Sequence, residues 1–282
     1  MASELARRVA VAAVGIPVAL GAAWLGGAAL ALLLAIAAGL AAAELNRISR
    51  EGGVPPLPGL AVGGAVLMVA LAALDPAGGP DGAGQGLFLV LLALVALTSA
   101  IWRSGVEGRP LAAAAIAVLG ALYCGGLLSH ALFLRHLPGV LMATDGLLVV
   151  ALPVVLTWSS DTFAYFTGRR FGRRKLIPAV SPGKTVEGAL GGVIGTMLVA
   201  ALFCTLATGR PYIPDPFVGA LLGLLVAMAA QVGDLAESLL KREAGVKDSG
   251  ALLPGHGGAL DRLDSLFFTL PVAYYFLILT GA

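Results

Sequence analysis

The sequence predicts an all-α, polytopic integral membrane protein, a helical bundle with about nine transmembrane helices. Of its 282 residues, 59% are hydrophobic and only 12% are charged, and the mean hydropathy is +0.94. A soluble domain is about half apolar and about a quarter charged, so a water-facing surface could not accommodate this excess. The apolar runs do not alternate with polar residues at period two, which argues against a transmembrane β-barrel. Helices remain, because they satisfy their own backbone polar groups inside a bilayer.

Apolar runs, each near the ~20 residues that cross a bilayer core, divide the chain from end to end. The predicted spans are residues 9–25, 28–45, 57–74, 86–102, 111–134, 146–168, 187–208, 217–240 and 264–280. The third and fourth runs are short and interrupted by glycine, so eight or ten spans remain open. No connection is long enough to form a folded soluble domain. Any chemistry therefore belongs to the helical bundle or to its face.

The distribution of basic residues predicts the orientation of the chain. When the N-terminus is placed in the cytoplasm and the spans alternate, only Arg135 and Arg210 of the 18 Lys and Arg lie outside. Cytoplasmic loops carry an excess of Lys and Arg, so this bias supports a cytoplasmic N-terminus. Loops 169–186 and 241–263 then both face the cytoplasm. The net charge of +2 argues neither for nor against a charged partner, but the apolar composition excludes a nucleic-acid binder with a broad basic face, so no nucleic-acid partner is expected.

The first half of the chain carries few chemical signals. Glu44, His130 and His136 lie near the ends of predicted spans, and we interpret them as interfacial or solvated side chains. Cys124 and Cys204 both lie inside apolar runs. We interpret them as buried thiols rather than as a disulfide or a metal pair.

Charged residues interrupt the eighth predicted span. Asp234, Glu237, Ser238 and Lys241 are spaced i, i+3, i+4 and i+7, so they lie on one helix face. A charged side chain at a helix centre costs roughly 2.5–3.5 kcal/mol on insertion scales. These side chains must therefore face the bundle interior, a cavity or a partner charge. A purely structural pair between Glu237 and Lys241 is the simpler alternative.

Carboxylates, basic side chains, His256 and adjacent glycines occur together in the next stretch, residues 247–264. Carboxylate oxygens suit Mg²⁺, which takes one or two protein carboxylates plus substrate phosphates. Glycines let backbone N–H groups approach an anion, and Lys and Arg hold phosphate oxygens. A metal-assisted phosphate site explains all of these residue types together.

A second polar stretch precedes the seventh span. Gly183-Lys184-Thr185 ends like a P-loop, but the first glycine of that motif would fall at Pro178 and no preceding strand is expected. We therefore predict a polar start to the seventh helix, whose first N–H groups favour an anion. The basic run 169–175 is either a topology signal or a site for acidic lipid head groups.

Residues 238–264, SLLKREAGVKDSGALLPGHGGALDRLD, resemble the signature of phosphatidate cytidylyltransferases, also called CDP-diacylglycerol synthases. Segments 161–165 and 181–188 are similar to that family as well. The resemblance implies transfer of CMP from CTP to phosphatidate, giving CDP-diacylglycerol and pyrophosphate. It also implies Mg²⁺, with a second, monovalent cation such as K⁺, and a homodimer in a bacterial inner membrane. The active site would open to the cytoplasm and to membrane lipids.

The resemblance maps the metal ligands of the family onto Asp234 and Asp261. The catalytic candidates are Asp234, Asp261, Lys241, Arg262, Asp264 and His256, and the substrate-binding candidates are Ser181, Lys184, Thr185, Ser238, Lys247 and Asp161. Asp264 is either a further ligand or a group that orients Arg262. His256 either protonates pyrophosphate or braces the glycine turn. The phosphate of phosphatidate is already a nucleophile, so no strong general base is needed.

This interpretation divides the chain into two regions. Spans one to five, residues 1–145, form a lipid-embedded scaffold, and residues 146–282 form the catalytic region with loops 169–186 and 241–263. Two other functions remain open, namely a CTP-dependent polyprenol or dolichol kinase and a membrane transporter that uses Asp234 and Glu237 in an ion path.

Overall fold

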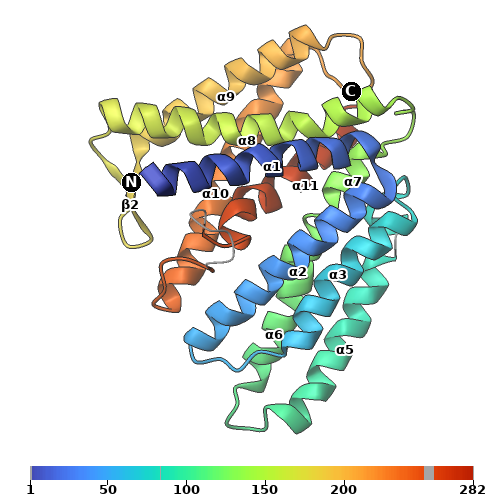
Figure 1. Cartoon of the computed structure of the whole chain (residues 1–282), viewed down its shortest axis with the longest axis vertical. Coiled ribbons are helices and arrows are strands. Elements are labelled where there is room, and N and C mark those ends of the chain that lie inside the picture. The colour runs from blue at the N-terminus through green and yellow to red at the C-terminus, as the bar shows by residue number, and fades with distance from the viewer. Residues whose placement is uncertain (1, 83, 251–256, 282) are drawn as a thin grey trace. The chain divides into compact units, whose positions relative to one another are not determined.

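The structure is a computed structural model that describes residues 2–82, 84–250 and 257–281, with side chains from residue 13 onward (Figure 1). It confirms an all-α polytopic membrane protein with one short hairpin. Seven described helical segments are long and apolar enough to cross a membrane, one of them the continuous stretch Pro110–Arg135. Pro58–Leu74 and Ala13–Leu25, the part of the first helix whose side chains are described, are shorter apolar segments. Each of the nine predicted runs is therefore helical, while the number of nine spans stays a prediction.

The chain forms two compact units. Unit 1 comprises Met1–Pro138 and Leu240–Leu263, and unit 2 comprises Gly139–Leu239 and Asp264–Ala282. Unit 1 contains α1 (Ala2–Leu25), α2 (Gly27–Glu51), α3 (Pro58–Leu74), α4 (Gly79–Gly82), α5 (Gln85–Arg103), α6 (Pro110–Gly120), the π-helix η1 (Ala121–Gly126) and α7 (His130–Arg135). Unit 2 contains α8 (Ala143–Phe171), β1 (Lys175–Ile177), β2 (Ser181–Thr185), α9 (Val186–Leu206) and most of α10 (Pro216–Glu243) and α11 (Leu260–Thr280). Segment 240–263 groups with the N-terminal helices, and the division at residue 145 into a scaffold and a catalytic region stays a prediction.

Small residues allow the helices of unit 1 to pack closely. Helix α3 packs against α2 and η1, and α2, α3 and α5 lie side by side (Figure 1). Buried alanines such as Ala38, Ala61 and Ala65 line these contacts. At Gly125, in the π-helix, an added Cβ would collide with the backbone of Ala65. Helix association in membranes depends on such close approach, because lipid is as apolar as the side chains themselves.

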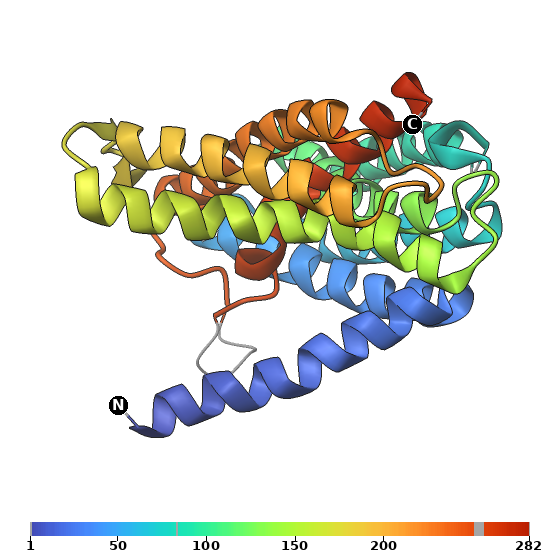
Figure 2. The same cartoon turned by 90° about the horizontal axis from the view of Figure 1, so that it is seen from above.

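Unit 2 is built on the pair α8 and α9, which pack along their lengths (Figure 2). Strands β1 and β2 join them as an antiparallel hairpin, with Lys175 opposite Thr185 and Ile177 opposite Ser181. The sequence-based expectation of no strand in this region is therefore wrong. The Glu187 carboxylate accepts hydrogen bonds from the N–H groups of Arg173 and Arg174, at 3.0 and 3.2 Å. This contact fixes the segment that follows α8 beside the first turn of α9.

Helix α10 packs so closely against α9 at Gly223 that a larger residue there would clash. A Cβ at Gly223 would lie 2.9 Å from both Met197 Cα and Thr196 O of α9, and backbone atoms cannot rotate away. We expect Gly223→Ala to lower the stability of the detergent-solubilised protein by about 1–3 kcal/mol, through overpacking. Gly63→Ala in α3 is the control, because a Cβ there meets nothing within 4 Å. Alanine should stabilise that helix by up to about 1 kcal/mol, so thermal unfolding should shift in opposite directions.

Candidate functional site

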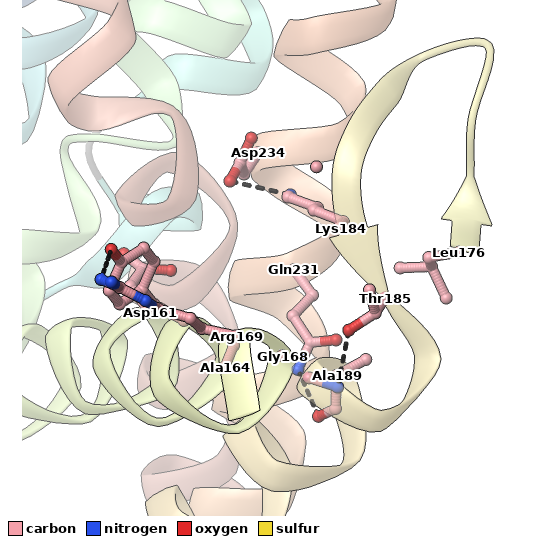
Figure 3. A pocket seen from close by; sticks show the side chains of 13 residues that line it. Asp161, Ala164, Gly168, Arg169, Leu176, Lys184, Thr185, Ala189, Gln231 and Asp234 are labelled. Atoms are coloured by element: carbon pink, nitrogen blue, oxygen red, sulfur yellow. Dashed lines mark hydrogen bonds and ion pairs between the residues drawn. The ribbon is translucent and has the colours of Figure 1, made fainter. Parts of the chain in front are cut away.

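A cavity of about 440 Å³ opens in unit 2 among α8, the hairpin, α9 and α10 (Figure 3). Its lining includes the four predicted site residues Asp161, Lys184, Thr185 and Asp234. Gln231 lines it as well, and its Nε2 donates a hydrogen bond to Ala189 O at 3.1 Å. The structure thus brings residues from three predicted motifs into one pocket.

An ion pair forms part of the lining of this pocket. Lys184 Nζ is 2.7 Å from Asp234 Oδ2, and Figure 3 shows the two side chains pointing toward each other. Ser238 donates a hydrogen bond to Asp234 Oδ1 at 3.3 Å, one turn further along α10. Asp161 and Asp264 lie within electrostatic range of Asp234, and Lys184 attracts Asp161 too. Carboxylates therefore gather around the Lys184 ammonium group, and Arg169 adds a second cation to the lining of the pocket.

Local folding rules place Lys184 in the pocket. Thr185 is the N-cap of α9, and its Oγ1 accepts a hydrogen bond from the Gly188 N–H at 3.1 Å. Threonine is a favoured N-cap, because its side chain satisfies an otherwise unpaired N–H of the first turn. The cap fixes the end of β2 and therefore the position of Lys184. The contact predicted between Thr185 and a phosphate stays a prediction.

A second polar centre lies in unit 1, around Asp261. Lys241 Nζ donates to Asp261 Oδ1 at 2.7 Å, and both side chains are nearly buried, with 12% and 11% exposure. The N–H of Gly258 donates to Oδ2 at 2.9 Å, and the N–H of Ser249 lies 3.2 Å from the same oxygen. The Asp261 carboxylate is therefore held by one cation and by backbone from two separate stretches of chain.

Glu44 is the functional candidate that sequence reasoning missed. It was interpreted as interfacial or solvated, but it is 8% exposed. Its carboxylate accepts hydrogen bonds from Ser249 Oγ at 2.8 Å, Ala259 N at 3.0 Å and Leu260 N at 2.8 Å. A signal existed, because an acid in the apolar run of α2 requires an internal partner. Nothing in the sequence indicated which partner it would have.

Several other predictions have mixed outcomes. Cys124 and Cys204 are buried free thiols, as expected. His130 is buried rather than solvated, with Nδ1 3.1 Å from Gly126 O, because the helix continues past it into the packed bundle. His136 accepts a hydrogen bond from the Gly27 N–H at 3.2 Å through Nε2, so it joins two chain segments instead of only facing solvent.

The remaining site candidates differ in their surroundings, and one of them lies outside the described residues. Lys247 and Arg262 are exposed, and Ser181 is partly buried opposite Ile177 in the hairpin. Asp264 Oδ1 accepts a hydrogen bond from the Ser265 N–H at 2.6 Å. His256 lies outside the described residues, so its role stays a prediction. Asp234 and Asp261 belong to different units, and their common metal centre also stays a prediction.

The carboxylates of the two centres fit a cation, such as Mg²⁺, that the substrate helps to bind. Within residues 2–82, 84–250 and 257–281, no group of three or more His, Cys, Asp or Glu is arranged to hold a metal ion. Mg²⁺ needs no such cage, because it keeps waters and takes one or two carboxylates plus substrate phosphates. The carboxylates of Asp234 and Asp261 are oxygen donors of this kind, and each lies 2.7 Å from a lysine ammonium group.

Comparisons with known proteins place the chain in a family. A model described as the cytidylyltransferase family matches residues 6–280. A phosphatidate cytidylyltransferase of Synechocystis is 50% identical over 137 residues, 48% of this chain and 44% of that protein. One from Bacillus subtilis is 42% identical over 162 residues, 57% of each chain. An uncharacterized Escherichia coli protein, YnbB, is 49% identical over 151 residues, 53% of this chain and 49% of that protein.

The aligned region spans about half the length of these curated relatives. The family model, in contrast, covers nearly the whole chain, including the pocket of unit 2 and the Asp261 centre of unit 1. The chain belongs to the cytidylyltransferase family.

Proposed function

We propose that the protein transfers CMP from CTP to phosphatidate, giving CDP-diacylglycerol and pyrophosphate. The observation that carries the proposal is a carboxylate–lysine pair at 2.7 Å in each unit, Lys184–Asp234 and Lys241–Asp261, each formed by residues of the family-like motifs. Keeping charges inside a membrane protein is costly, so such pairs mark a functional site. The phosphatidate cytidylyltransferases among the relatives support the same reaction.

In the proposed reaction, an oxygen of the phosphatidate phosphate attacks the α-phosphorus of CTP in line. The new bond joins that oxygen to the α-phosphorus, and the bond to the β-phosphate bridging oxygen breaks, releasing pyrophosphate. Lys184 and Lys241 orient the anionic reactants and balance charge on the leaving oxygens, a role of positioning and electrostatic stabilisation. Asp234 and Asp261 are the residues that would hold Mg²⁺. When bound, that ion supplies Lewis-acid stabilisation of phosphate oxygens.

We further propose that the protein lies in a bacterial inner membrane with its N-terminus and active site facing the cytoplasm, where CTP is. The placement of Lys and Arg supports this orientation. A homodimer and a second, monovalent cation such as K⁺ follow from the family resemblance. Mass determination in detergent tests the dimer, and replacing K⁺ by an organic cation tests the monovalent site.

The decisive assay supplies radiolabelled CTP, phosphatidate and Mg²⁺ to the detergent-solubilised full chain. We expect lipid-linked CMP and pyrophosphate, whereas a polyprenol kinase would release CDP when given its own acceptor. Ion flux into reconstituted vesicles without CTP turnover would instead support a transporter.

Removing divalent ions should stop the reaction. With excess chelator we expect CDP-diacylglycerol formation to fall to background, because lysine ammonium groups do not supply the Lewis-acid stabilisation that a divalent ion would provide. Titrating Mg²⁺ back should restore the rate. Equal product yield in chelator and in Mg²⁺ would contradict the metal-assisted proposal.

A further inference from the structure

Glu44 holds together two stretches of chain that are separated by residues 251–256. Its Oε2 accepts from the Ser249 hydroxyl before that stretch and from the Leu260 N–H after it, each at 2.8 Å. Its Oε1 accepts from the Ala259 N–H at 3.0 Å. A carboxylate at the first N–H groups of α11 is also favoured by the helix dipole. Glu44 is only 8% exposed, so these three hydrogen bonds form a buried, specific contact and not a surface contact.

The glycines around Glu44 are required for this contact. A Cβ at Gly250 or at Gly258 would collide with the Glu44 carboxylate. These glycines lie on either side of residues 251–256, so the backbone on both sides approaches the same side chain. Any larger residue at either position would displace Glu44.

The same two stretches hold Asp261. Its carboxylate accepts from the N–H groups of Ser249 and Gly258, whose neighbours Gly250 and Ala259 contact Glu44. Ser249 contacts both acids, Glu44 through its hydroxyl and Asp261 through its backbone. Glu44 therefore fixes the donors that orient Asp261, although it is 217 positions away in the sequence.

We propose that Glu44 is a positioning residue for cytidylyl transfer, which acts by holding the backbone that orients Asp261 toward its divalent cation. This inference rests on the proposed function. Groups that orient a metal ligand typically contribute about 10–100-fold to metal affinity or activity. Glu44 should have an effect of that size without touching either substrate.

The test compares Glu44→Gln with Glu51→Gln, the same substitution at an exposed position of α2. Glutamine has the same shape but accepts hydrogen bonds on only one terminal atom, so its NH₂ group must face a backbone N–H. We expect Glu44→Gln to require about 10–100-fold more Mg²⁺ for half-maximal activity. Amide hydrogen exchange, measured without metal, should also become faster at Ala259 and Leu260. Glu51→Gln should match the wild type in both measurements.

A loss of maximal rate with unchanged Mg²⁺ requirement and unchanged exchange would overturn the proposal, since Glu44 would then neither hold this backbone nor act through the cation. If Glu44→Gln does not fold, Ser249→Ala carries the test, because it removes only the hydroxyl donor. We expect a smaller shift in the same direction, and no shift overturns the proposal. A wild-type protein that makes no CDP-diacylglycerol would contradict the proposed function instead, while the exchange measurement still reports on Glu44.

Discussion

Replacing Asp261 by Asn is expected to lower CDP-diacylglycerol synthesis at least about 100-fold, the upper end of what loss of a metal-orienting group costs. Asn keeps one acceptor oxygen but loses the charge that pairs with Lys241 at 2.7 Å. It also presents an NH₂ group to the N–H donors of Ser249 and Gly258. The initial rate with saturating CTP and phosphatidate, over a range of Mg²⁺ concentrations, measures the effect.

The stability of this variant needs its own control. Removing one partner of a buried ion pair costs about 3–5 kcal/mol, because the other charge is left unpaired. The double variant Asp261→Asn with Lys241→Met removes both charges, so we expect its unfolding temperature to recover while its activity does not. Asp81→Asn, at an exposed position, should resemble the wild type. Near-normal synthesis by Asp261→Asn would refute the role assigned to Asp261.

Lys184→Gln is expected to lower kcat/KM about 10–100-fold, which corresponds to about 1.4–2.8 kcal/mol of lost transition-state stabilisation. Lys184 is the cation that faces Asp234 at 2.7 Å and attracts Asp161. Without it, Asp234 loses its cation, and the pocket of unit 2, which Arg169 also lines, becomes more negative toward two anionic substrates. Steady-state kinetics with CTP and phosphatidate varied separately measures the change.

The hairpin supplies the matched control for Lys184. Lys175 lies in β1 opposite Thr185, is exposed, and does not line the cavity. Lys175→Gln should therefore leave kcat/KM unchanged, and Lys184→Arg should recover part of the rate because it keeps the charge. Equal kinetics for Lys184→Gln and Lys175→Gln would contradict the assignment.

The helical architecture could be predicted because hydropathy alone determines which segments enter a bilayer. Every predicted apolar run is helical, and the buried thiols at Cys124 and Cys204 follow from the same argument. The π-helix at Ala121–Gly126 could not be foreseen, because it depends on the approach of Gly125 to the backbone of Ala65. Such a contact between distant segments leaves no periodic signal in the sequence.

The site was predicted in its residue types but not in its contacts. The spacing of Asp234 and Ser238 on one helix face indicated a functional face, and they do form a hydrogen bond. The strand at Ser181–Thr185 was missed because it depends on hydrogen bonds to the opposite strand, Lys175–Ile177. The hairpin also depends on the hydrogen bond from the Arg173 N–H to the carboxylate of Glu187, fourteen residues later in the chain. Glu44 was missed for the same reason over a much longer separation.

The contact of Glu44 with Ser249 has a consequence for biosynthesis, since 205 positions separate the two residues. At about 5–20 residues per second, a ribosome needs roughly 10–40 s to make the intervening chain. During that interval α2 already carries an acidic side chain whose hydrogen-bond partners do not yet exist. Premature termination before position 249 would therefore leave a product in which Glu44 lacks all three of these partners.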